Sequence, residues 1–405
     1  MGLLLAIHLL NHLDRQILTA VFPLIQAEWQ LDDAQLGLAA ALVSLARVLV
    51  MLPAGWLADR RGRLWMLRLA DAGWGGLAVL SGLAGQFWQF LLLRAGVGLA
   101  DGANGPADIA FLSEAYPQER RGRAVALYSL GMYTGSTLGF AFGAVVGAQW
   151  SWRLAFIIPG LVGCLLGGLV FRLRAPAVPD VGAIRELPLR RVYPEGETRR
   201  VAPPRPTRAM ASRPVVGGLL GGVFGLMALT ALMSWTPTFM VRYHASSVAQ
   251  AGLASSLVFL PAGVLGTLLG GWLSDRWVRV NPAARFYSAA LGLWLGLPAT
   301  ALAVFAPGWL FYLLSAFLAG VCLSSFLTPF NVLAQESAAP AWRATTVSVA
   351  LLTSQLGGAI GVGLVGLLSD ASGLRMAMLL PLAAILLAGL SFLAGGRSHR
   401  GVSPG

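Results

Sequence analysis

The hexapeptide Gly55-Trp56-Leu57-Ala58-Asp59-Arg60 occurs a second time, almost unchanged, as Gly271-Trp272-Leu273-Ser274-Asp275-Arg276. The two copies are 216 residues apart. Each follows an apolar run long enough to cross a bilayer, which takes about 20 residues of helix. The chain is therefore expected to consist of two similar halves. Repeats of this kind are typical of secondary transporters, whose substrate site lies between the halves near the middle of the membrane.

The composition excludes a soluble globular protein. Of the 405 residues, 57% are hydrophobic and only 11% are charged, whereas soluble domains carry about a quarter charged residues. The 50 glycines suit a bundle of membrane helices, in which small residues let backbones approach closely. The net charge of +12 arises without any lysine. We attribute it to arginine-rich loops that face anionic lipid and the cytoplasm, not to a nucleic-acid partner.

Hydropathy predicts an all-α membrane protein with twelve transmembrane helices in two pseudo-symmetric six-helix bundles. The N-terminal bundle is residues 1–172, with spans near 3–26, 35–57, 64–84, 86–112, 123–147 and 153–172. Residues 173–213 are polar and rich in Pro and Arg, which is typical of a cytoplasmic linker. The C-terminal bundle is residues 214–396, with spans near 214–240, 248–273, 284–306, 308–334, 344–368 and 374–395, before a cytoplasmic tail, 397–405.

Arginine placement predicts the orientation in the membrane. Basic residues gather in the loops on one side, whereas the opposite loops are poor in them. The positive-inside rule then places both termini in the cytoplasm of a bacterial-type inner membrane. The residues concerned are Arg60, Arg61, Arg63, Arg120, Arg121, Arg123, Arg276, Arg279, Arg285, Arg343, Arg397 and Arg400.

Two elements resemble those of the major facilitator superfamily. The stretch 55–63 resembles its signature loop, and Arg94 to Gly98 resembles its RxxxG element on the fourth helix. The resemblance implies an alternating-access carrier. It also implies a role in conformational gating for the charged residues of the repeated loop, which are Asp59, Arg60, Arg63, Asp275 and Arg276.

Within that superfamily, the chain is most similar to the Spinster-like lysolipid transporters. Residues 11–15 (NHLDR) resemble their first-helix NxxDR, and residues 98–102 resemble their fourth-helix GxGEA, with Asp101 in place of glutamate. Residues 115–124 resemble their FPxxxRGRA, and a glycine-rich fifth span follows. The anion:cation symporters share the DR pair and the EA-like element, so they form a close rival family.

Ionisable residues inside the predicted spans define the candidate site. A charge in the middle of the bilayer costs at least a few kcal/mol, so it normally lines a cavity and has a partner. Asp14, Arg15, Arg47, Arg94 and Asp101 are such residues, and all belong to the N-terminal half. We predict Asp101, and Asp14 after it, as proton-coupling residues that alternate between pairing with an arginine and accepting a proton. A permanent ion pair that only holds helices together is the alternative for each acid.

Arginine binds carboxylate or phosphate in a bidentate manner. Arg15, Arg47 and Arg94 are therefore predicted substrate ligands, although Arg47 is alternatively the partner of Asp14. The C-terminal spans contain no comparable acid and offer only scattered polar side chains such as Ser234 and Gln355. One charged wall and one mostly apolar wall suit an amphiphile with an anionic head. The further predicted substrate ligands are Asn11, Tyr133, Trp235 and Asn331.

These features predict a proton-coupled secondary transporter for a lysophospholipid or similar amphipathic lipid. A symporter of small organic anions, such as sugar acids or aromatic carboxylates, is the second hypothesis, and a drug exporter is the third. No nucleophile–base pair, metal-ligand cluster or phosphate-binding loop is recognisable, so we expect neither an enzyme nor a cofactor. The expected partners are the substrate, protons and membrane lipids, and the expected state is a monomer.

Overall fold

The computed structural model describes residues 2–115, 118–172, 212–336 and 343–400, and these contain helices and no strand. The N-terminal helices are α1 (Gly2–Ala20), α2 (Phe22–Trp29), α3 (Asp33–Arg61), α4 (Arg63–Gly82), α5 (Phe87–Ala115), α6 (Gln118–Gln149) and α7 (Trp152–Val170). The C-terminal helices are α10 (Arg213–Tyr243), α11 (Val248–Val278), α12 (Ala284–Val304), α13 (Trp309–Ser324), α14 (Leu327–Glu336), α15 (Arg343–Ser372), α16 (Leu374–Ala377) and α17 (Leu379–Arg400). Each predicted span coincides with one helix or with two consecutive helices. Most of the predicted linker lies outside the described residues, and α17 extends beyond the predicted end of the C-terminal bundle.

Three spans predicted as continuous are divided in the structure, and a proline follows each break. The break between α1 and α2 precedes Pro23, that between α13 and α14 precedes Pro329, and that between α16 and α17 precedes Pro381. Proline lacks the N–H that would bond to the carbonyl four residues earlier, and its ring clashes with that carbonyl. The predicted spans 3–26, 308–334 and 374–395 therefore each consist of two consecutive helices.

Glycines set the distances between helices in the N-terminal half. A Cβ on Gly135 or Gly139 of α6 would overlap the backbone of α1 at Leu9 or Leu13. On α5, a Cβ on Gly102 would overlap the carbonyl oxygen of Arg47 on α3. These close approaches join α6 to α1 and α5 to α3, and the charged candidate residues lie on α1, α3 and α5.

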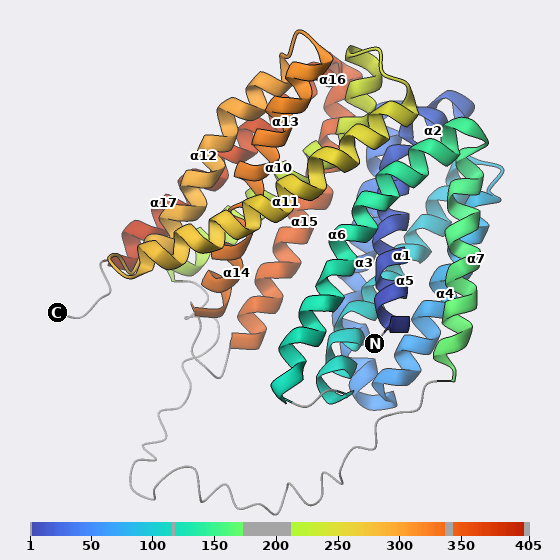
Figure 1. Cartoon of the computed structure of the whole chain (residues 1–405), viewed down its shortest axis with the longest axis horizontal. Coiled ribbons are helices and arrows are strands. Elements are labelled where there is room, and N and C mark those ends of the chain that lie inside the picture. Colours follow the sequence, from blue (N-terminus) through green and yellow to red (C-terminus); the bar gives the residue numbers. More distant parts are fainter. Residues whose placement is uncertain (1, 116–117, 173–211, 337–342, 401–405) are drawn as a thin grey trace, which may run out of the picture.

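The two halves contact each other at one end and diverge toward the other (Figure 1). Near the contacting end, α3 packs on α15, where Gly366 lies against the backbone of Asp33. There α6 also packs on α11, where Gly252 lies against Ala144. The N-terminus and the far end of α17 lie at the diverging end (Figure 1). The cavity between the halves is therefore closed at the end where α3 begins.

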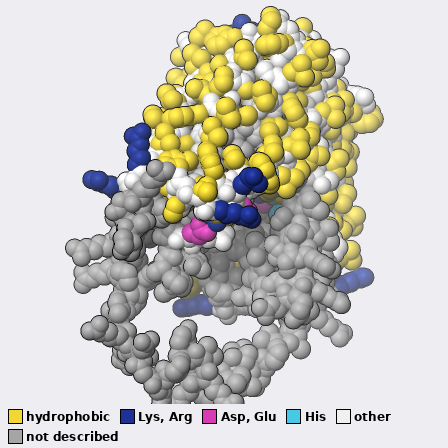
Figure 2. All heavy atoms as spheres, turned by 60° about the vertical axis from the view of Figure 1, so that its left-hand side comes forward, with side chains coloured by type: hydrophobic (Ala, Val, Ile, Leu, Met, Phe, Trp, Pro, Cys, Tyr) yellow, Lys and Arg dark blue, Asp and Glu magenta, His cyan; other side chains and the backbone are white. Residues whose placement is uncertain are grey.

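The outer surface is suited to lipid. Large apolar side chains on it are well exposed, among them Leu49, Leu165 and Leu257. Figure 2 shows a broad hydrophobic flank, with arginine side chains gathered along its lower edge. In the described residues, eight helical segments are long and apolar enough to cross a membrane. Helices α1 and α5, which carry the charges of the candidate site, are not among these eight.

Candidate functional site

A polar cavity lies between the two halves. It holds about 840 Å³ of empty space, part of it open to solvent. Helices α1, α3 and α5 supply the charged part of its lining, which is Asp14, Arg15, Arg47 and Arg94. Further polar side chains from both halves complete it, namely Gln16, Thr19, Ser44, Thr230, Ser234 and Gln355.

One carboxylate lies between two arginines at this cavity. Nη2 of Arg15 donates to Oδ2 of Asp101 at 2.6 Å, and Nε of Arg47 lies 4.0 Å from the same oxygen. The Asp101 side chain is 9% exposed. The close packing of Gly102 on the Arg47 backbone brings this acid next to α3. Two guanidinium groups sharing one carboxylate leave a positive charge of one at the site.

Asp14, the acid that lines the cavity, belongs to a separate and more deeply buried ion pair. Arg94 donates to Asp14 through Nη2 at 2.9 Å and through Nη1 at 3.3 Å, and both side chains are only 1% exposed. The guanidinium also lies 4.7 Å from the ring centroid of Phe156, which adds a cation–π contact. Asp14 is thus paired with Arg94 and not with Arg15 or Arg47. Arg47 instead belongs to the pair formed by Arg15 and Asp101.

Among the described residues, the predicted ligands Asn11, Trp235 and Asn331 do not line this cavity. Asn11 is buried on α1, and its Oδ1 has no hydrogen-bond partner. Trp235 is fully buried, and its indole N–H donates to the carbonyl oxygen of Val362 at 3.0 Å. Trp235 therefore joins α10 to α15. Asn331 is exposed on α14, and the side chain of Tyr133 lies outside the described residues.

The wall from the C-terminal half is more polar than the sequence indicated. Thr230 and Ser234 are one turn apart on α10, and Gln355 faces them from α15. Their spacing on α10 was a usable signal, because residues four apart share a helix face. The wall therefore combines these three polar side chains with Met233, Gly358, Ala359 and Val362.

An apolar pocket lies separately, inside the C-terminal half. It holds about 450 Å³ of empty space among α10, α11, α12 and α13. Leu232, Phe239 and Phe259 are among its lining residues. Its polar contact is a hydrogen bond of 3.2 Å from the Tyr312 hydroxyl to Oγ1 of Thr236.

The predicted gating residues lie near the diverging end. Asp275 is 3.6 Å from Arg285, which also forms an ion pair with Glu336 at 2.7 Å, so one arginine connects α11, α12 and α14. Arg60 lies 4.0 Å from the ring centroid of Trp56, and Arg276 lies 6.0 Å from that of Trp272. The two copies of the repeat thus share this stacking contact. The side chains of Asp59 and Arg63 lie outside the described set.

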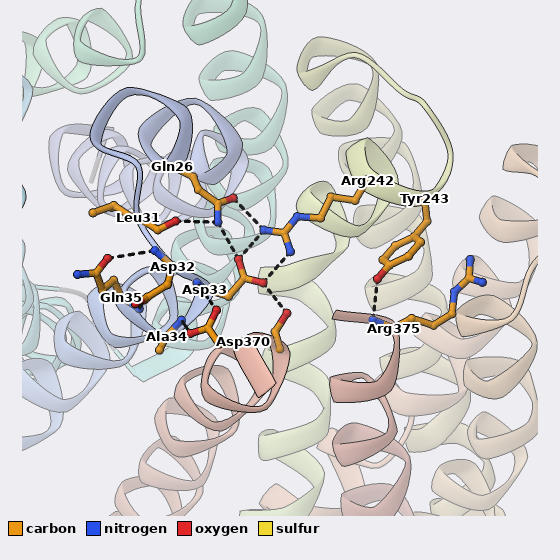
Figure 3. Close-up of polar contacts among 11 residues, drawn as sticks. Gln26, Leu31, Asp32, Asp33, Ala34, Gln35, Arg242, Tyr243, Asp370 and Arg375 are labelled. Atoms are coloured by element: carbon orange, nitrogen blue, oxygen red, sulfur yellow. Dashed lines mark hydrogen bonds and ion pairs between the residues drawn. The ribbon is translucent and has the colours of Figure 1, made fainter. Parts of the chain in front are cut away.

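A polar cluster connects the halves at the closed end (Figure 3). Both Nη atoms of Arg242 on α10 donate to the carboxylate of Asp33 at the start of α3, and Ser369 of α15 also donates to it. Gln26 of α2 donates to Asp33 at 2.9 Å. The carboxylate of Asp370 accepts the backbone N–H groups of residues 33 and 34 at 2.8 and 2.9 Å. We call these residues the Asp33 cluster.

Comparisons with known proteins agree with this architecture. The family model described as Major Facilitator Superfamily matches residues 4–362 and 245–403. The chain is 26% identical to an MFS-type efflux pump of Mycolicibacterium smegmatis, over 99% of this chain and 93% of the relative. It is 27% identical to the gallate transporter of Pseudomonas putida, over 98% of this chain and 91% of the relative.

Among solved structures, the fold resembles a bacterial homologue of the human lysosomal transporter Spinster in an inward-facing, occupied conformation. The TM-score is 0.84, with 23% sequence identity over 100% of this chain and 98% of that chain. Among the described residues, no group of three or more His, Cys, Asp or Glu side chains is arranged to hold a metal ion.

Proposed function

Because the chain belongs to the Major Facilitator Superfamily, we propose that it is a secondary transporter that carries a small organic anion together with a proton. The observation that carries this proposal is the site at which Arg15 and Arg47 share the single carboxylate of Asp101. The hydroxyl and amide groups of Thr230, Ser234 and Gln355 opposite it suit the polar body of a sugar acid or a hydroxylated aromatic acid. The gallate transporter among the relatives is consistent with such a substrate.

Coupling follows from competition for the same two cations. The carboxylate of Asp101 and that of the substrate both need Arg15 and Arg47 as hydrogen-bond donors. A proton on Asp101 weakens its ion pairs and frees the guanidinium groups for the substrate. By thermodynamic linkage, the bound anion then favours protonation of Asp101 to the same degree. Anion and proton therefore bind together and cross together.

Asp14 has a different role in this proposal. Its bidentate pair with Arg94 is buried and supported by aromatic rings, so the pair joins α1 to α5 in this conformation. Asp14 remains the second candidate for proton coupling, and Arg94 the third candidate arginine ligand, because both line the cavity.

The proposed topology places both termini in the cytoplasm of an inner membrane, as the arginine-rich loops indicate. The diverging end is then cytoplasmic, and this conformation faces inward. The two six-helix bundles move against each other about the cavity, and the charged residues of the repeated loop act in gating. A monomer is sufficient, since one chain supplies every residue of the site.

A lysophospholipid or similar lipid is the second candidate substrate. The apolar pocket among α10, α11, α12 and α13 is the observation that favours it, because an acyl chain needs such a surface. The sequence favours this lipid over the small anion. The polar side chains Thr230, Ser234 and Gln355 of the cavity support the small anion instead.

Thermal-shift binding to the purified protein separates the two substrates. We expect gallate, 4-hydroxybenzoate or a sugar acid to stabilise the protein, and lysophospholipids to have no specific effect. Arg47→Gln should weaken anion binding about 10- to 100-fold, because a charge-assisted hydrogen bond contributes about 1.5–3 kcal/mol to the binding free energy. Stabilisation by lysolipids alone would reject the small-anion proposal.

Uptake into proteoliposomes tests the coupling. Asp101→Asn removes the competing carboxylate, so this variant should retain anion binding but lose the pH dependence of binding and of uptake. Asp14→Asn is the matched comparison and should instead lower the thermal stability. Unchanged pH-driven uptake by Asp101→Asn would remove Asp101 from the mechanism.

A further inference from the structure

A second buried carboxyl group lies outside the cavity, at the contact between α4 and α5. Asp71 of α4 is 1% exposed, and Nδ2 of Asn104 on α5 donates to its Oδ1 at 2.6 Å. The neighbours of Asp71 belong to an apolar cluster that includes Leu67, Ala70 and Ala103. The transport mechanism above uses neither Asp71 nor Asn104.

Asp71 differs from the other buried acids in its partners. Asp14, Asp33 and Asp101 each contact an arginine. Within the described part of the chain, no arginine or histidine forms an ion pair with Asp71. An unpaired carboxylate in apolar surroundings within a membrane costs several kcal/mol.

The charged groups nearest to Asp71 along its own helix and its partner helix are engaged elsewhere. On α4, Arg68 donates to the carbonyl oxygen of Phe171 at 3.2 Å. On α5, Asp101 pairs with Arg15. From α7, it is Gly167 that packs on the backbone at residues 71 and 72.

Two buried oxygen atoms of this pair lack a hydrogen-bond partner, namely Oδ2 of Asp71 and Oδ1 of Asn104. Buried polar atoms are rarely left without a partner. One proton on Oδ2 of Asp71 would give both oxygen atoms a partner, because the resulting hydroxyl would donate a hydrogen bond to Oδ1 of Asn104. Oδ1 of Asp71 would still accept from the amide, which gives a cyclic pair of carboxylic acid and amide.

We propose that Asp71 is a second proton-binding site, protonated in this conformation and held by Asn104. The proton comes from water and involves no substrate. Asn104 follows Asp101 by three residues, about one turn of α5. Asp101 is a residue of α5 that pairs with arginines of α1 and α3, whereas Asp71 contacts α5 from α4. Loss of the proton would leave a buried, unpaired charge, so release is tied to separation of α4 from α5.

Infrared difference spectroscopy of the purified protein at neutral pH tests this site without any substrate. Wild-type protein should show the C=O stretching band of a protonated carboxyl group, and Asp71→Asn should remove it. Asp101→Asn is the matched control and should retain the band, because the Asp101 carboxylate forms ion pairs with Arg15 and Arg47. Identical wild-type and Asp71→Asn spectra would overturn the proposal.

Asn104→Leu provides the second test, which holds even if Asp71→Asn does not fold. This variant removes both hydrogen bonds but leaves the proton on Asp71. The band should therefore persist and move to the higher frequency of a free carboxylic acid. An unshifted band would show that Asn104 does not hold the proton. Since no transported solute is present, either failure is distinguishable from failure of the anion-transport proposal.

Discussion

Replacing Arg242 with glutamine should open the closed end of the transporter more readily than any change at its acidic partner. The Asp33 side chain is 6% exposed, whereas that of Arg242 is 30% exposed. Arg242→Gln leaves a buried carboxylate without its cation. Asp33→Asn leaves an arginine that can turn toward water. The two single variants therefore break the same ion pair at different cost.

The size of the expected shift follows from the exposed fractions of the Asp33 and Arg242 side chains. Truncating one partner of a buried charge pair costs about 2–5 kcal/mol. In Arg242→Gln, Gln26 and Ser369 continue to donate to Asp33, and the wild-type Arg242 is partly solvated. We therefore expect a cost at the lower end of this range. A cost of about 2 kcal/mol shifts the equilibrium toward the open form of this end roughly 30-fold. Asp33→Asn should shift it by less than roughly tenfold, as expected for a partly exposed pair.

Spin-label distances measure this equilibrium. One label replaces Trp150 at the turn between α6 and α7, and the other replaces Phe305 beyond α12, both well exposed. Cys164 and Cys322 are first replaced by serine. In Arg242→Gln, the longer-distance population should increase.

The matched control is Arg375→Gln. Arg375 lies near Arg242 (Figure 3), but its guanidinium lies over the ring of Tyr243 at 4.6 Å and forms no ion pair within the described residues. The variant Arg375→Gln should therefore leave the distances between the spin labels unchanged. Equal shifts in Arg242→Gln and Asp33→Asn, or no shift in either, would refute the argument from burial.

Two further predictions concern stability. Gly135→Ala should destabilise the purified protein by about 1–3 kcal/mol through overlap with the carbonyl of Leu9, whereas Gly73→Ala, which has open space around it, should be neutral or slightly stabilising in the same thermal melts. At Glu28, beyond the first span, burial raises the pKa of the carboxyl group, but hydrogen bonds from Arg153 and a tryptophan lower it more, so the net pKa lies below 4.5. The stability that this ionised group contributes is complete above about pH 4.5 and disappears as the pH falls through the lowered pKa. The melting temperature of Glu28→Gln should therefore fall less on acidification than that of the wild type, and an equal fall in both proteins would contradict this.

The location of the site was predictable from the sequence, because a charge inside the membrane needs a partner. The pairing was not. Asp14 and Arg15 are adjacent, so their side chains leave α1 about 100° apart. They therefore reach different turns of α5, where Asp14 meets Arg94 and Arg15 meets Asp101. The three-dimensional arrangement of α1 and α5 decides which acid meets which arginine.

The opposite wall could not be predicted for a related reason. Ser234 and Gln355 were visible as polar residues, but nothing in the sequence places α10 beside α15. Trp235 was predicted as a ligand because it lies beside Ser234 in a long apolar run. It turned out to donate to Val362 across that same contact. Asp71 was overlooked because it belongs to no motif, and its burial against α5 appears only in three dimensions.

Because of the Asp33 cluster, opening the closed end of the transporter requires water to enter between the two halves. Asp370 of one half accepts the first N–H groups of α3 in the other half, as an anion at a helix N-terminus commonly does. When the halves separate there, these groups and the Asp33 carboxylate must be solvated by water. Opening therefore takes up water that closing expels. Excluded osmolytes such as sucrose should favour the closed end, so the rate of the transport cycle should depend on water activity even without any change in substrate or proton concentration.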